Sequence, residues 1–102
     1  MSTHLRAYRK VTALLYRMRE RSRIAEDAWD RATSGIPGEP ENTGQWPVGL
    51  LNFARNKAVE LIAEGNHFLP ERSRAIAAID EAVRSAFEQD LRASIFREPS
   101  AI

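Results

Sequence analysis

The sequence predicts a single all-α domain over residues 1–102, built as a three-helix bundle. A long N-terminal helix over about 3–33 is followed by an antiparallel helical hairpin over about 47–64 and 70–96. Apolar residues recur at steps of three and four in each segment, as one face of a helix requires. No stretch alternates apolar and polar residues over four or more positions, as a half-buried strand would. The length is that of one ordinary domain.

The first helix is expected to start near Thr3, and no glycine or proline occurs before Gly35. At 1.5 Å per residue it would be about 45 Å long, more than a compact bundle of this mass needs. It should therefore bend or break near Arg21–Arg23, or extend to meet another molecule, such as a second copy in a homodimer. Its apolar face follows a heptad spacing through Tyr8, Val11, Leu15, Met18, Ala25 and Trp29.

Proline and glycine delimit the remaining elements. Residues 34–45 read as a Pro/Gly-rich loop, and Pro47 opens the second helix, which Gly65-Asn66 ends. Pro70 starts the third helix and Pro99 stops it, so residues 97–102 are expected to fray. The inward positions are Leu50, Leu51, Ala54, Ala58, Leu61 and Ile62 in the second helix, and Ile76, Ile79, Val83, Ala86, Phe87, Leu91 and Ile95 in the third.

Composition restricts the classes of function. The chain has no cysteine, which excludes disulfides, thiolate metal sites and cysteine nucleophiles and fits a cytoplasmic location. No stretch approaches the roughly 20 apolar residues that span a bilayer, so no membrane partner is expected. The strong preference for arginine over lysine, with abundant alanine, is typical of a high-GC bacterial or phage genome.

Charge is distributed unevenly along the chain. Residues 1–23 hold seven basic residues and one acid, for a net charge of +6, whereas residues 24–45 carry −4. In one unbroken helix the cations would crowd the N-terminal half and the acids the C-terminal part, against the helix dipole. Helix stability would then not explain the pattern. The candidate partner-binding residues are the cations of this helix, Arg6, Arg9, Lys10, Arg17, Arg19 and Arg21.

Four of these cations, Arg6, Lys10, Arg17 and Arg21, would fall within about 60° of one another around the helix axis. Such a stripe suits carboxylates or phosphates, because the planar guanidinium group of arginine can form two parallel hydrogen bonds with either. We expect a small non-enzymatic interaction protein, a regulator, adaptor or inhibitor, that binds an acidic protein surface. A nucleic-acid-binding protein using the same stripe is one alternative, and an ordinary solvated face is another.

The stretch Arg17–Trp29 resembles the arginine-rich RNA-hairpin-binding helix of lambdoid phage antitermination proteins over 13 residues. It departs from that pattern at Met18 and Ser22, which belong to the apolar or neutral face. It also departs at Asp27 and Asp30, where acids would repel phosphate. The resemblance implies a continuous helix that binds RNA, in line with the nucleic-acid alternative.

A further alternative is a metal-dependent helical enzyme centred on Glu60, Glu64 and His67. Glu-x-x-His is the ligand spacing of di-iron carboxylate bundles. Gly65-Asn66 stands between Glu64 and His67, however, so His67 is expected to lie past the helix end. No serine or threonine has a recognisable base nearby, and no glycine-rich loop has phosphate-binding spacing. The leading interpretation therefore includes no catalytic residue, metal or cofactor.

Overall fold

A computed structural model describes residues 3–34 and 48–97, which contain four α-helices and no strand. They are α1 (Thr3–Arg17), α2 (Arg23–Ser34), α3 (Val48–Glu64) and α4 (Leu69–Arg97). The all-α prediction is confirmed. The prediction of three helices is wrong, because the segment expected as one helix over 3–33 forms α1 and α2. Apart from Ser34 and Arg97, which are helical, the predicted loop 34–45 and frayed end 97–102 lie outside the described residues.

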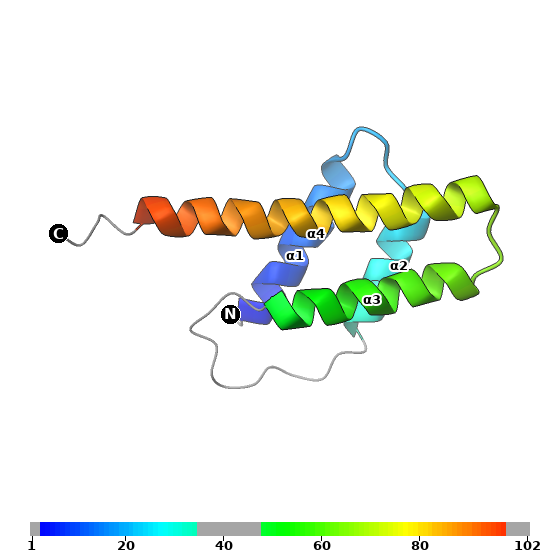
Figure 1. Ribbon diagram of the computed structural model, residues 1–102, viewed down its shortest axis with the longest axis horizontal. Coiled ribbons are helices and arrows are strands. Elements are labelled where there is room, and N and C mark those ends of the chain that lie inside the picture. The colour runs from blue at the N-terminus through cyan, green and yellow to red at the C-terminus, as the bar shows by residue number, and fades with distance from the viewer. Residues whose placement is uncertain (1–2, 35–47, 98–102) are drawn as a thin grey trace.

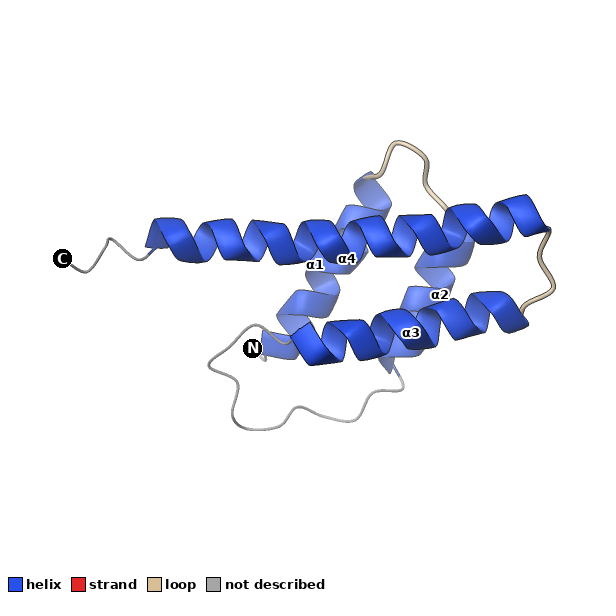
Figure 2. Ribbon diagram, in the orientation of Figure 1, coloured by secondary structure: helices blue, strands red, loops and turns tan. Residues whose placement is uncertain are grey.

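The four helices are arranged in two layers (Figure 1). α1 and α2 form one layer, and α3 and α4 cross in front of it, side by side and in opposite directions. The molecule measures 54 × 30 × 17 Å, and its short dimension is that of two stacked helix layers. Figure 2 shows that the C-terminal part of the 29-residue α4 continues beyond the other helices.

The break between α1 and α2 has a local cause in Ser22. The Ser22 hydroxyl accepts a hydrogen bond from the backbone N–H of Ala25 at 3.2 Å. The Ser22 carbonyl accepts the first helical bond of α2, from the Glu26 N–H, at 3.0 Å. Ser22 is thus the N-cap of α2. Its hydroxyl provides an acceptor for the Ala25 N–H, which has no acceptor within α2 itself.

The break also allows Trp29 to pack against Tyr8. Trp29 is 1% exposed, and its ring meets that of Tyr8 edge to face with the centroids 6.1 Å apart. Its indole N–H donates to the Tyr8 carbonyl at 3.4 Å. In an unbroken helix the 21 steps between these residues would separate them by about 31 Å. Burial of Trp29 therefore favours two helices over one.

Two short helices also change the meaning of the charge pattern. Arg17 lies in the last turn of α1, and Glu26 lies in the first turn of α2. A cation at a helix C-terminus and an acid at a helix N-terminus both complement the helix dipole. The inference that helix stability does not explain the pattern is wrong for these residues, because it assumed one continuous helix.

The core is built mainly from alanine. Among the residues whose side chains are described, 17 apolar ones are buried and ten of these are alanines, which lets the helix backbones approach closely. The buried residues are Ala7, Tyr8, Val11 and Leu15 in α1, Ala25, Ala28, Trp29 and Ala32 in α2, Leu51, Ala54, Ala58 and Ile62 in α3, and Ala75, Ala78, Ile79, Ala82 and Ala86 in α4.

The predicted inward faces are confirmed for most of the residues whose side chains are described. Leu61, Ile76 and Val83 are only partly buried, at the edge of the core. Phe87, predicted to face inward, is 38% exposed because the buried face of α4 is centred on its alanines. The side chains of Leu50, Leu91 and Ile95 lie outside the described residues.

Candidate partner-binding surface

Three of the predicted partner-binding cations lie along one side of α1. Arg6, Lys10 and Arg17 occupy positions within about 40° of one another around the helix axis. Arg6 and Arg17 are exposed, and Lys10 is partly exposed. Arg9 lies elsewhere on α1, where it lines a shallow groove together with Asp30 and Thr33 of α2. We call the line formed by Arg6, Lys10 and Arg17 the α1 stripe.

Arg19 and Arg21 belong to the non-helical segment 18–22 rather than to the α1 stripe. This separation follows from the break at Ser22 and corrects the predicted four-residue stripe. It also means that residues 17–29 do not form the continuous helix that their resemblance to RNA-hairpin-binding helices implied.

Arg21 is held by contacts within the protein. Its guanidinium donates two hydrogen bonds to the carboxylate of Glu26, at 2.8 and 3.2 Å. These hydrogen bonds raise the pKa of Arg21. The guanidinium carbon also lies 4.7 Å from the centroid of the Tyr16 ring, in a cation–π contact. Arg21 therefore ties the end of α1 to the start of α2.

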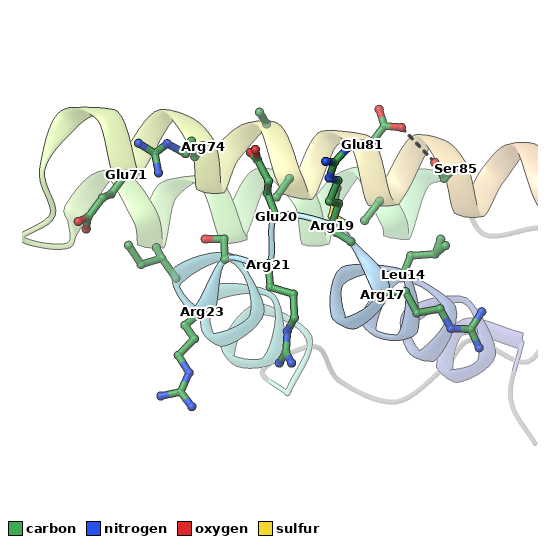
Figure 3. Close-up of a pocket in the computed structure, with 16 residues that line it drawn as sticks. Leu14, Arg17, Arg19, Glu20, Arg21, Arg23, Glu71, Arg74, Glu81 and Ser85 are labelled. Carbon is green, nitrogen blue, oxygen red and sulfur yellow. Dashed lines mark hydrogen bonds between the residues drawn. The ribbon is translucent and has the colours of Figure 1, made fainter.

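Segment 18–22 and its flanking residues border an open groove against α4, of about 1300 Å³ (Figure 3). On the side of α1 and α2 it is lined by the partly buried side chains of Leu14, Met18 and Ile24. The α4 side presents the small residues Ala77, Ala78 and Ala82. The volume exceeds the roughly 300–1,000 Å³ of small-molecule pockets, so the groove has the size for a segment of a macromolecule.

The rim of the groove is charged, with arginine in excess. It carries five arginines and three glutamates: Arg17, Arg19, Arg21, Arg23, Arg74, Glu20, Glu71 and Glu81. In Figure 3, Arg19 and Glu20 point toward α4, whereas Arg21 and Arg23 point away from it. The charge available to a ligand is therefore set by which of these groups already have partners.

On the α4 wall, Glu81 is already paired. It accepts hydrogen bonds from Arg84 at 2.7 and 2.8 Å, and these bonds lower the pKa of the Glu81 carboxyl. Ser85 donates a longer bond of 3.5 Å to the same carboxylate, drawn as a dashed line in Figure 3. The Glu81 charge is thus largely offset within α4.

Apart from Arg21, the cations of the α1 stripe and of the groove rim have no such partner among the described side chains. Within residues 3–34 and 48–97, the following make no ion pair with another described side chain: Arg6, Lys10, Arg17, Arg19, Arg23 and Arg74. Arginines on other faces do, since Arg31 pairs with Asp27, Arg55 with Asp80, and Arg84 with Glu81 and Glu88.

Two rim arginines, Arg23 and Arg74, were not among the predicted partner-binding residues. Arg23 is the first residue of α2 and stands close to Arg19 and Arg21 in the sequence. Arg74 lies on α4, more than 50 positions away in the sequence, and only the tertiary fold brings it to the groove. No local pattern around Arg74 marks it.

The residues of the metal alternative do not form a cluster. Glu60 and Glu64 are exposed on α3, and His67 follows the helix end. The His67 ring lies over Gly65, where an added Cβ would meet its Nε2 at 2.6 Å. Among the described residues, no group of three or more histidine, aspartate or glutamate side chains has an arrangement suited to a metal ion.

Two further observations complete the description. Within the described ranges, no helix combines the length and apolarity needed to cross a membrane. Comparison of the chain with protein-family models, with curated proteins and with solved structures finds no match.

Proposed function

We propose that this protein is a small non-enzymatic interaction protein, a regulator, adaptor or inhibitor, that binds an acidic surface of a partner protein. The α1 stripe and Arg19 make the contact, with Arg23 and Arg74 at its border. Arg21 acts as a brace of the α1–α2 turn. The guanidinium groups would form charge-assisted hydrogen bonds with carboxylates of the partner.

One observation carries this proposal. Arg6, Lys10 and Arg17 lie along one side of α1, Arg19 follows in segment 18–22, and none of them has an ion pair with another described side chain, whereas Arg31, Arg55 and Arg84 are paired. An apolar-floored groove lies beside Arg17 and Arg19, and a desolvated setting strengthens ionic contacts. The mixed charge of the rim, with Glu20 and Glu71 present, favours a patterned protein surface over the uniform charge of a nucleic-acid backbone.

The test compares two variants with the same loss of charge. The first replaces Lys10, Arg17 and Arg19 by Gln, and the control replaces Arg31, Arg55 and Lys57, also one lysine and two arginines. At about 0.3–1 kcal/mol for each exposed ion pair lost, binding of poly-glutamate at low salt should weaken about tenfold in the first variant. It should change little in the control. Fluorescence anisotropy measures binding, and circular dichroism confirms that both variants are folded.

The same titration with random-sequence RNA and DNA separates the alternatives. Poly-glutamate should bind more tightly than either nucleic acid at equal ionic strength. Tighter binding of RNA or DNA, with a steep loss on adding salt, would instead support the nucleic-acid function. Equal affinities for poly-glutamate in the two triple variants would show that the α1 stripe is ordinary solvated surface.

A further inference from the structure

We infer that the groove beside α4 takes one amphipathic helix of the partner, with its apolar side on the groove floor and its acidic residues along one flank. This inference rests on the proposed function and specifies the partner segment. Helix-in-groove docking is a common mode of peptide recognition. Three properties of the groove lead to this occupant: its length, its floor and the placement of its charges.

The wall formed by α4 has the periodicity of a helix-packing face. Its groove-lining residues Glu71, Arg74, Ala78, Glu81 and Ser85 are spaced alternately by three and four positions, as along a coiled-coil seam. The 14 steps from Glu71 to Ser85 correspond to about 21 Å of helix. A partner helix lying along this wall would therefore contact it over about four turns.

The floor suits the apolar side of such a helix. Ala77 is exposed, and Ala78 and Ala82 are almost fully buried at the base of the groove. All three are small, so a partner helix can approach this face of α4 closely, toward the short end of the usual 8–10 Å interaxial range. Leu14 and Met18, partly buried on the other side, offer larger apolar surface to the same ligand. The partner helix should thus present a ridge of apolar residues at helical spacing.

The two walls of the groove carry different charges, and this difference determines which flank of the partner helix is acidic. On the side of α1 and segment 18–22, Arg17 and Arg19 outnumber the one acid, Glu20. Neither arginine has an ion pair with a described side chain, so this wall favours acids on the facing flank. On the α4 side, Arg84 largely offsets Glu81, and Glu71 and Arg74 have opposite charges, so this wall offers acids no net attraction. The second flank of the partner helix should therefore be neutral or basic.

The experiment uses the full chain and three fluorescent 15-residue peptides with high helix propensity. One has an apolar ridge with glutamates along one flank, a second has the same ridge with lysines there, and a third scrambles the first so that no ridge remains. We expect the first to bind at least about tenfold more tightly than either of the others, a difference of about 1.4 kcal/mol.

Substitutions at Ala77, an exposed groove-lining residue of α4, test whether the peptide binds in the groove. Ala77→Trp fills the groove and Ala77→Glu adds a like charge, so each should weaken binding of the glutamate-flank peptide about tenfold. The matched controls Ala63→Trp and Ala63→Glu, at an exposed alanine of α3, should leave it unchanged. Two chemically different changes keep the test valid if one of them perturbs the fold.

The outcomes distinguish this inference from the proposed function. If neither Ala77 variant weakens binding, or if the scrambled peptide binds equally well, the groove is not the docking site, although acidic ligands are still bound through the α1 stripe. If neither the glutamate-flank peptide nor poly-glutamate binds at concentrations up to about 1 mM, both proposals are wrong. Binding of poly-glutamate measures the contribution of charge alone, and the comparison of the peptides measures the contribution of the groove.

Discussion

Tyr8 contributes its backbone and its ring to the core, but its hydroxyl is buried without a hydrogen-bond partner among the described residues. The Tyr8 carbonyl accepts from the Thr12 hydroxyl at 3.0 Å and from the Trp29 indole. The ring packs against Trp29. Removing only the hydroxyl would keep all of these contacts, so Tyr8 offers a test of what an unpaired polar group costs.

We expect Tyr8→Phe to leave the free energy of unfolding unchanged at neutral pH or to raise it by up to about 1 kcal/mol, because a buried group without a partner is removed. Denaturant unfolding measures this. A loss of more than about 1 kcal/mol would show that the hydroxyl has a stabilising partner.

The same variant changes the response to alkali. Burial raises the pKa of the Tyr8 phenol above its ordinary value of 10.0. A raised folded-state pKa means that this contribution to stability is fully present below pH 10 and is lost as the pH rises through the folded value. Tyr8→Phe should therefore lose less stability above pH 10 than the wild type, as denaturant unfolding at neutral and alkaline pH would measure.

At the scale of the element, the break between α1 and α2 shows what apolar spacing can and cannot determine. The heptad positions continue through Leu15, Met18, Ser22 and Ala25, so the pattern is equally compatible with one helix or two. A break near Arg21–Arg23 was one of the open alternatives, and local sequence could not select it. The contact that favours it joins Tyr8 to Trp29, two residues on separate helices.

Ser22→Ala should lower the free energy of unfolding by about 1 kcal/mol, because it removes the acceptor for the Ala25 N–H. Ser22→Asp is the matched control, since aspartate caps helices about as well as serine. Urea denaturation compares the two. If Ser22→Ala is as stable as the wild type, the cap does not determine where α2 begins, and the burial of Trp29 alone would account for the break.

At the scale of the whole molecule, the sequence predicted the helical class, the bounds of α3 and α4 and most of the core. It could not predict the candidate site as a surface. The basic residues were visible in the sequence, but the groove needs α4 beside segment 18–22, and Arg74 and Ala77 come from that distant helix. The pairing of Arg21 with Glu26 also depends on the turn geometry.

An alanine core makes the molecule sensitive to added volume. Ala58 on α3 is fully buried, so Ala58→Leu should force the helix layers apart and cost about 1–3 kcal/mol. Ala63→Leu, at an exposed position of the same helix, should have little effect. Thermal unfolding followed by circular dichroism compares them, and equal stabilities would show that the core has room for larger side chains.

The crossing of the two layers also affects how the chain can fold during its synthesis. α1 and α2 can pair as soon as both have left the ribosome, but within the described ranges α3 and α4 are the helices that cover the face they present to the core. At about 5–20 residues per second, translating from the end of α2 to Ala86 takes roughly 3 to 10 s. Throughout that interval the nascent α1–α2 pair exposes apolar surface to chaperones and to neighbouring nascent chains.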